Sequence, residues 1–285
     1  MQRAASWADP RSWGSWPESS GQWWDMPGSS TGRVFALGEG RPIVVVGGLA
    51  GGCGLLSPLL VELAERHSVY AIDLDGQPRL RRGERITIGS EAQRVADAIG
   101  WLGLERPTLL GVSYGGAVAL ELAARRPGLL GGLILSGIEA AFRPNLGTQV
   151  ARRVLEKYAL PPDSPFVNQF FNLLHGERPG SVQVAEFVVD RCWETDQSLM
   201  VRRLQALDGF DVADRLWKVQ VPTRVVAGSR DLVVPPARQR ALAQGIVGAR
   251  FATVEGAGHV GFATHPAEFA RQARAFVAQR ARAYC

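Results

Sequence analysis

From Arg33 onward, short apolar runs alternate with longer helix-like segments, and this alternation constrains the fold more than any other feature of the chain. Such alternation is typical of βαβ units, in which a helix joins two parallel strands of one sheet. The runs are continuously apolar rather than alternating, as strands buried on both faces require. The sequence therefore predicts an α/β fold with a mostly parallel central sheet. The predicted strands are residues 34–37, 43–46, 69–73, 108–112, 132–136, 223–227 and 250–254.

Helices are predicted between these strands, on the two faces of the sheet. In the last one, Phe269, Ala273 and Phe276 recur at helical spacing while charged residues fall on other faces, as in a helix that packs on a sheet. The predicted flanking helices are residues 58–66, 91–102, 114–126, 236–245 and 266–282.

The alternation is interrupted between residues 137 and 210, where no strand signal stands out. A structureless segment of this length is uncommon inside a compact domain, so we expect a helical cap. Its predicted helices are 149–158, 167–174 and 196–207. The predicted division is therefore a core of residues 33–137 and 211–285, with a cap insertion over 138–210 after the sixth core strand.

Residues 1–32 form a Trp-rich N-terminal extension without helical or strand periodicity. Five of the eight tryptophans of the chain lie here: Trp7, Trp13, Trp16, Trp23 and Trp24. Disordered tails are normally poor in aromatic residues. We therefore expect these side chains to pack on the body of the protein, or else on a partner.

Composition excludes several classes of protein. The net charge is only +5, and no basic run with interleaved aromatics is present, so no nucleic-acid partner is predicted. Three widely spaced cysteines, at 53, 192 and 285, exclude a disulfide framework and a CxxC metal site, which favours a cytoplasmic location. The uncharged stretch 42–61 contains five Gly and two Pro, so we predict a strand and turn and no membrane span. No cofactor or metal is expected, and the oligomeric state is open, with a homodimer as one option.

The strongest local motif is Gly111-Val-Ser113-Tyr114-Gly115, placed between a predicted strand and a predicted helix. A sharp turn at this point lifts the serine hydroxyl above the sheet, and glycines two residues away on either side allow close packing. This arrangement is called a nucleophile elbow. The alternative is a glycine-rich turn with an incidental serine.

A serine nucleophile needs a base, usually a histidine oriented by a carboxylate. His259 follows a predicted strand in a glycine-containing loop, whereas structural roles are expected for the histidines at 67, 175 and 265. Asp231 follows another strand, in the turn Gly-Ser-Arg-Asp, and its alternative role is to stabilise that turn. Glu255 and Glu139 are the next candidates for the acid.

Acyl chemistry also needs donors to the oxyanion that develops on the substrate. The backbone N–H of Tyr114, directly after the serine, is one predicted donor. The second is the N–H of Leu49, in the loop Gly47-Gly-Leu-Ala-Gly-Gly52. Glycine-rich loops also cradle phosphates, but this loop has neither a Lys-Ser/Thr ending nor a G-x-G-x-x-G pattern before a helix.

These motifs, in the order Ser, Asp, His, resemble the α/β-hydrolase superfamily over residues 33–282. The resemblance implies an α/β-hydrolase fold and a serine hydrolase of a carboxylic ester, a lactone or a similar small acyl substrate. Two departures stand out. Gly47-Gly48 occupies the place where relatives commonly have His-Gly, and Asp75 occupies the place of a proline.

The substrate and the exact reaction are left open by the sequence. Apolar residues of the cap, together with Val260 of the core, are expected to line an acyl site, although packing among the cap helices explains most of the cap residues equally well; the candidates are Phe170, Phe171, Trp193 and Val260. The same three catalytic residues also serve C–C bond hydrolases, lyases and perhydrolases. A non-catalytic small-molecule receptor on this scaffold is the further alternative, since a fold does not establish an activity.

Overall fold

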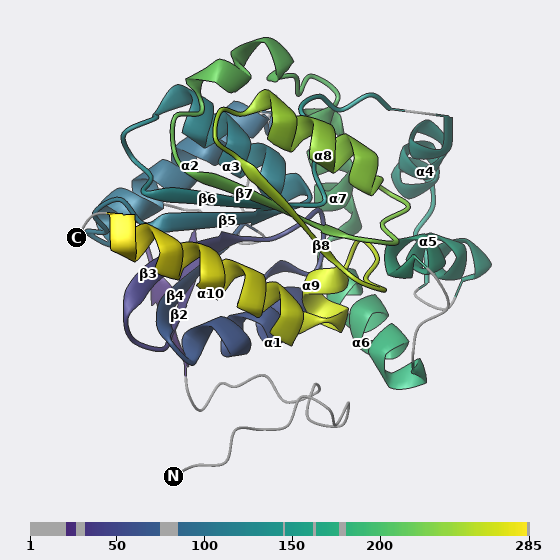
Figure 1. Ribbon diagram of the computed structural model, residues 1–285. Helices are drawn as coiled ribbons and strands as arrows, with labels where there is room; N and C mark the ends of the chain where they lie inside the picture. Colours follow the sequence, from purple (N-terminus) through teal and green to yellow (C-terminus); the bar gives the residue numbers. More distant parts are fainter. Residues whose placement is uncertain are drawn as a thin grey trace.

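An eight-stranded sheet runs through the middle of the molecule, with helices on both faces (Figure 1). The computed structural model describes residues 21–26, 32–74, 85–144, 146–161, 164–176 and 181–283, without the side chains at 166 and 280–283. Asp75 and the tryptophans at 7, 13 and 16 lie outside the described residues. In spatial order the strands are β1 (Gly21–Asp25), β2 (Arg33–Leu37), β4 (His67–Asp73), β3 (Arg41–Val46), β5 (Thr108–Val112), β6 (Gly132–Ser136), β7 (Thr223–Gly228) and β8 (Arg250–Val254).

The predicted parallel sheet is confirmed, and all seven predicted strands form. Strands β4, β3, β5, β6, β7 and β8 pair in parallel, whereas β2 is antiparallel to both of its neighbours. Every residue of β5 and β6 is buried, in agreement with their continuous apolar sequences. Because these strands are parallel, the segments that follow them emerge at one edge of the sheet.

Two helical layers cover the sheet (Figure 1). Helices α1 (Gly52–Ala64), α9 (Gly261–Thr264) and α10 (Pro266–Ala283) lie on one face. The opposite face carries α2 (Ile88–Trp101), α3 (Tyr114–Arg125) and α8 (Pro236–Gly245), with the short 3-10 helix Ala213–Lys218 beside α3 and α8. Each layer contributes to its own cluster of buried apolar side chains.

Helix α1 begins six residues earlier than the sequence indicates. The prediction placed Pro58 at the first turn, where proline is favoured. In the structure, Gly51 in the left-handed region (φ 83°) precedes the helix, and Pro58 lies in its interior. Starting at Gly52 buries Cys53, Leu55 and Leu56 as well, and burial of this apolar surface favours the longer helix.

Strand β1 was not predicted, because it lies within the Trp-rich segment that lacks periodicity. It pairs with β2 along its whole length. The ring of Trp23 lies 5.2 Å from that of Phe35, and Trp24 contacts Tyr70 and Trp101 with ring centroids 6.2 and 6.3 Å apart. These two tryptophans therefore pack on the body of the protein, as expected.

Four helices between β6 and β7 form the cap: α4 (Leu146–Lys157), α5 (Pro165–His175), α6 (Val182–Trp193) and α7 (Gln197–Leu207). The predicted helical insertion is confirmed, and three of its helices were predicted. Helix α6 was missed because its valines have low intrinsic helix propensity. Its start is fixed by Ser181, whose hydroxyl accepts a hydrogen bond from the Val184 N–H at 3.2 Å.

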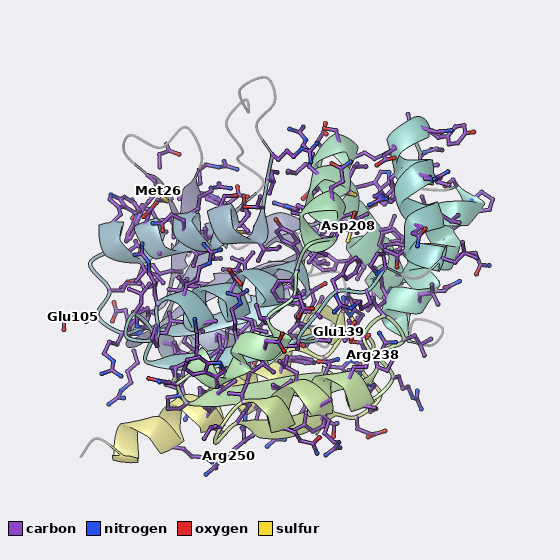
Figure 2. All side chains as sticks on the ribbon, turned by 90° about the horizontal axis from the view of Figure 1, so that it is seen from above. Met26, Glu105, Glu139, Asp208, Arg238 and Arg250 are labelled. Carbon is purple, nitrogen blue, oxygen red and sulfur yellow. The ribbon has the colours of Figure 1, made fainter. Side chains whose placement is uncertain are left out.

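The two connections between the core and the cap run side by side. Ala141 and Asp211 form an antiparallel bridge, and Arg143 pairs with Asp211 at 2.6 Å. Next to this bridge, Glu139 after β6 pairs with Arg238 of α8 at 3.1 Å, and Figure 2 shows these two labelled side chains close together. The two connecting segments are thus paired with each other through backbone and side-chain contacts where the cap joins the core.

Across the described ranges, none of the helices is both long enough and apolar enough to cross a membrane.

Two helical glycines differ in the space that is available for a side chain. A Cβ atom at Gly115 in α3 would lie 2.3 Å from the Val46 carbonyl oxygen, whereas nothing lies within 4 Å of one at Gly100 in α2. Alanine is favoured over glycine in a helix by up to about 1 kcal/mol. We therefore expect Gly100→Ala to raise the free energy of unfolding, and Gly115→Ala to lower it by about 1–3 kcal/mol through overpacking. Urea unfolding measures both values, and a gain in stability at both positions would contradict the steric explanation.

Candidate active site

Ser113 lies between β5 and α3 with φ 52° and ψ −116°, a conformation that non-glycine residues rarely adopt. Its N–H donates to the Ser136 carbonyl of β6 at 2.8 Å, and its own carbonyl accepts from the first turn of α3. Close packing of the glycine at 115 against the end of β3 leaves no space for a larger residue. These constraints hold the serine hydroxyl at the carboxyl edge of the sheet and at the N-terminus of α3.

His259, in the loop that follows β8, contacts the hydroxyl of Ser113. The distance between His259 Nε2 and Ser113 Oγ is 2.9 Å, and the imidazole is buried. The position of the loop is fixed by the cap, because the Val260 N–H donates to the Leu174 carbonyl of α5 at 3.2 Å. The structure therefore brings together two side chains that are 146 residues apart in sequence.

Asp231 lies on the other side of the imidazole and is only 2% exposed. Its Oδ2 is 3.0 Å from His259 Nδ1, and its Oδ1 accepts hydrogen bonds from the Val233 and Val234 N–H groups at 2.9 Å. An ionised carboxylate can only accept hydrogen bonds, so Nδ1 carries the proton. The unprotonated Nε2 then faces the serine hydroxyl, as a general base requires.

Gln239 of α8 completes this network and was missed by the sequence analysis. The side chain is 0% exposed. Its Nε2 donates to Asp231 Oδ2 at 3.0 Å, and its Oε1 accepts from the Gly137 N–H at 2.8 Å. No local motif marks this glutamine, because its partners lie in other segments of the chain.

Gly137 places the end of β6 against the imidazole. Its φ is 64°, and a Cβ atom there would lie 2.8 Å from His259 Cε1. Glycine is therefore required both for the backbone conformation and for the space that the histidine ring occupies.

The other candidate acids and histidines have different surroundings. Glu255 accepts a hydrogen bond from Ser229 at 3.2 Å, and Glu139 pairs with the arginine at 238. Burial lowers the pKa of His67, His175 and His265 below the ordinary value for histidine.

We call residues 47–52, between the end of β3 and the first residue of α1, the oxyanion loop, after the donor that the sequence predicts in it. It passes next to Ser113, since a Cβ atom at Gly48 would lie 3.6 Å from Ser113 Cβ. The Leu49 carbonyl accepts a hydrogen bond from Arg203 Nη1 at 2.8 Å, and the Gly51 N–H donates to Thr195 Oγ1 at 2.9 Å. Sequence analysis did not identify these contacts, which come from the cap.

Tyr114, the residue after the serine, is the first residue of α3. Its side chain is buried beside α2 and α7, and this burial raises the pKa of the phenol well above its usual range. Its N–H belongs to the first turn of the helix, where backbone donors are available to an acceptor above the sheet. The assignment of the Leu49 and Tyr114 amides as oxyanion donors stays a prediction.

The predicted substrate residues lie at the junction of the cap and the core. The ring of Phe171 packs edge-on against both Phe170 and Trp193, with centroid separations of 5.7 Å. Trp193 donates from its indole nitrogen to the Leu160 carbonyl at 2.9 Å. These rings and Val260 belong to, or pack against, the apolar cluster that includes α1 and α10, and their role in binding substrate stays a prediction.

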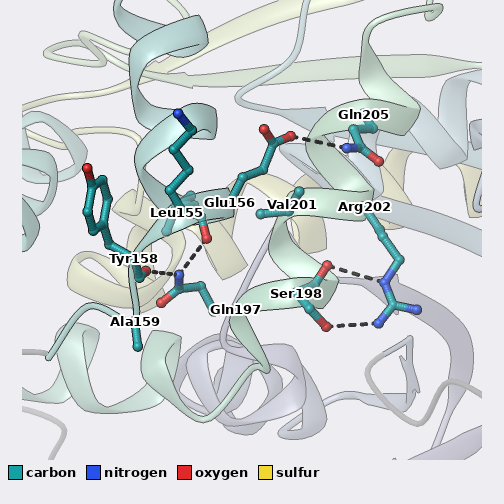
Figure 3. Close-up of a pocket in the computed structure, with 10 residues that line it drawn as sticks. Leu155, Glu156, Tyr158, Ala159, Gln197, Ser198, Val201, Arg202 and Gln205 are labelled. Atoms are coloured by element: carbon teal, nitrogen blue, oxygen red, sulfur yellow. Dashed lines mark hydrogen bonds between the residues drawn. The ribbon is translucent and has the colours of Figure 1, made fainter.

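A separate groove of about 480 Å³ lies between α4 and α7 (Figure 3). None of the four predicted substrate residues lines it. Several of its polar side chains bond to one another or to the nearby backbone: Gln197 caps the end of α4 through the Leu155 and Tyr158 carbonyls, and Arg202 bonds to Ser198 within α7. Within the part of the chain that the structure describes, no group of three or more His, Cys, Asp or Glu side chains is arranged to hold a metal ion.

Comparison with known proteins gives a family, two relatives and a solved structure. A model of the alpha/beta hydrolase family matches residues 43–272. The chain is 28% identical over 275 residues to the polyketide synthase ThaQ of Burkholderia thailandensis, a match that covers 91% of this chain and 13% of the synthase. It is 26% identical over 256 residues to the pimeloyl-(acyl-carrier protein) methyl ester esterase of Stenotrophomonas maltophilia, covering 86% of this chain and 96% of the esterase.

The chain also shares its fold with an enzyme whose structure has been solved. A thermophilic esterase from Thermogutta terrifontis superposes with a TM-score of 0.76 at 22% identity, and the match covers 92% of this chain and 98% of the esterase.

The contribution of Gln239 to the site is open to direct measurement. Gln239→Leu removes a donor to the buried Asp231 carboxylate and the acceptor for the Gly137 N–H. Groups left buried without a partner cost about 1–3 kcal/mol each. We expect urea unfolding to show a loss of at least about 1 kcal/mol. The control is Gln244→Leu on the exposed side of the same helix, and equal stabilities for the two variants would contradict the role assigned to Gln239.

Proposed function

Because the chain belongs to the alpha/beta hydrolase family, we propose that it is a serine hydrolase acting on a carboxylic ester, lactone or similar small acyl substrate. The fold predicted from the sequence is confirmed by the family match and by the superposition on the esterase. The proposed intermediate is an acyl-enzyme on Ser113. The finer assignment, to particular residues and to this substrate class, is our inference.

The observation that carries the proposal is the continuous chain of contacts from Ser113 through His259 to Asp231. The two contacts are 2.9 Å and 3.0 Å long, and both the imidazole and the carboxylate are buried. Hydrogen-bonded contacts between a nucleophile, a base and an orienting group are the signature of an activated serine. A receptor that only binds a ligand has no need of a serine held in a strained backbone conformation, and such strain concentrates at active sites.

In the acylation step, Ser113 Oγ attacks the carbonyl carbon of the substrate while His259 Nε2 takes the hydroxyl proton. The imidazolium that forms is stabilised by the Asp231 carboxylate. When the tetrahedral intermediate collapses, the bond to the leaving alcohol breaks and Nε2 returns the proton to the alcohol oxygen. The products of this step are the free alcohol and the acyl-enzyme.

Deacylation repeats these steps with water as the nucleophile in place of the serine hydroxyl. His259 Nε2 removes a proton from a water molecule, and the water oxygen attacks the acyl carbon. The proton then passes to Ser113 Oγ as the bond between Oγ and the acyl carbon breaks. The carboxylic acid leaves and the serine hydroxyl is restored. In both steps, negative charge develops on the former carbonyl oxygen, and the Leu49 and Tyr114 amides are the proposed donors to it.

The names of the relatives guide the choice of substrates for a first assay. The pimeloyl relative is a methyl ester esterase for an acyl group on a carrier protein, and this chain corresponds to one segment of a polyketide synthase. The assay compares p-nitrophenyl esters, methyl esters, lactones and thioesters, with β-diketones to detect C–C bond hydrolysis. Turnover of a diketone alone would replace the esterase assignment.

Substitution of the proposed nucleophile provides the principal test. Removing members of a serine triad lowers turnover by about three to six orders of magnitude, so Ser113→Ala is expected to reduce hydrolysis of a responsive ester by this amount. It is also expected to abolish labelling by a fluorophosphonate, which reacts with activated serines. Steady-state kinetics and gel fluorescence measure the two effects.

The matched control is Ser229→Ala, in the turn before Asp231, where the hydroxyl bonds to Glu255 rather than to the imidazole. This variant is expected to keep its labelling. Near-normal ester hydrolysis by folded Ser113→Ala would rule out the proposed nucleophile, and failure of the folded wild-type protein to react with either reagent would favour the receptor alternative.

A further inference from the structure

We infer that two buried side chains of the cap, Arg203 and Thr195, hold the oxyanion loop in the conformation that presents its donor to the substrate. This inference rests on the proposed function and deepens it. The cap then acts as a part of the active site, because the position of an oxyanion donor depends on contacts from α7 and from the segment before it. Arg203 and Thr195 are positioning residues, since each acts through the loop.

Arg203 reaches the loop from α7. The residue is 1% exposed, and its Nη1 donates to the Leu49 carbonyl at 2.8 Å, across 154 residues of sequence. Its guanidinium carbon also lies 5.4 Å from the centre of the Tyr114 ring. One buried cation thus contacts both residues whose backbone amides are the proposed oxyanion donors. Hydrogen bonds from a charged donor are stronger than those between neutral groups, particularly where water is excluded.

Thr195 holds the loop two residues further on. It is 3% exposed and lies between α6 and α7, and its Oγ1 accepts the hydrogen bond from the Gly51 N–H at 2.9 Å. The two contacts from the cap therefore fix the Leu49 carbonyl and the Gly51 amide. The two contacts hold the peptide planes on either side of Ala50. The proposed donor, the Leu49 N–H, lies in the adjacent plane, which is joined to these two at the Leu49 Cα.

The sequence of the loop explains why such support is needed. Four of its six residues are glycines, at 47, 48, 51 and 52, and glycine loses more conformational freedom on ordering than any other residue. The other two residues are Leu49 and Ala50, so the loop has no polar side chain of its own to support it. The contacts from the cap supply the constraint that the local sequence lacks.

The position of the loop matters because catalysis depends on small distances. An oxyanion donor works when it lies within hydrogen-bonding distance of the oxygen in the transition state, and loss of one such donor lowers turnover by about 100- to 1,000-fold. A displaced donor loses part of this contribution. Since the charge develops mainly in the transition state, the loss should appear in kcat more than in KM.

Thr195 allows the cleanest test, because valine has nearly the same shape as threonine and lacks only the hydroxyl. We expect Thr195→Val to lower kcat for a p-nitrophenyl ester by about 10- to 100-fold with KM changed by less than about 3-fold, a part of the loss known for removal of an oxyanion donor. Thr195→Ser keeps the hydroxyl and is expected to restore most of the rate. A purely structural role would lower the melting temperature and leave kcat of the folded enzyme unchanged.

Arg203→Met tests the second contact and has a matched control on the same helix. It is expected to lower kcat by a similar factor and to slow fluorophosphonate labelling, since phosphonylation also places negative charge in the oxyanion site. The control is Arg202→Met, whose guanidinium bonds to Ser198 in the groove of Figure 3, and we expect it to retain the wild-type kcat. Circular dichroism and the melting temperature establish that each variant is folded.

The outcomes separate this inference from the proposed function. If Ser113 in the wild-type protein is labelled and turns over esters while folded Thr195→Val and Arg203→Met have the wild-type kcat, the inference on the cap is overturned and the proposed function stands. If wild-type Ser113 is neither labelled nor acylated, both are overturned. A loss of kcat in Thr195→Val that Thr195→Ser does not share supports the inference.

Discussion

The buried carboxylate of Asp231 is the group on which the geometry of the site depends. Burial of an ionised carboxylate is costly unless hydrogen bonds replace those lost from water. Here the donors come from two backbone N–H groups of the same turn, the Gln239 amide and the His259 ring. Because the donors belong to α8 and to the loops after β7 and β8, the carboxylate joins three segments of the chain at one edge of the sheet. The orientation of the imidazole, and hence its contact with Ser113, follows from this network.

The three side chains that meet at the edge of the sheet were predictable because each stands in a local pattern at the end of a strand. Three motifs can each be recognised over a few residues: the elbow around Ser113, the turn before Asp231 and the glycine-containing loop before His259. Because the strands that precede them are parallel, the motifs lie at the same edge of the sheet. The role of Gln239 was not predictable, because its hydrogen bond to Gly137 joins residues 102 apart in sequence. The contacts of Thr195 and Arg203 with the oxyanion loop span still longer separations, 144 and 154 residues.

The two elements that were not predicted, α6 and β1, also depend on contacts between distant parts of the chain. Helix α6 contains several valines, which are weak helix formers, and it is stabilised by burial of Phe187, Val188 and Cys192 in the apolar cluster. Strand β1 lacks an alternating pattern, and its pairing with β2 and the packing of its tryptophans determine its conformation. In both cases tertiary contacts override a weak local preference.

These features describe one candidate active site with contributions from the core and from the cap. The core supplies the proposed nucleophile, base and acid, while the cap contacts the loop of His259 through Leu174 and the oxyanion loop through two side chains of its own. Movement of the cap would therefore change the geometry of the site as well as access to it.

In the proposed mechanism, Ser113 carries the acyl group during turnover. Its most direct test is to mix the protein with p-nitrophenyl acetate, quench with acid during the burst of p-nitrophenol release, and map the peptides by mass spectrometry. The proposed mechanism leads to an acetyl group on Ser113. Release of p-nitrophenol with the acetyl group on another residue, or with no acetylated peptide at all under these conditions, would contradict it.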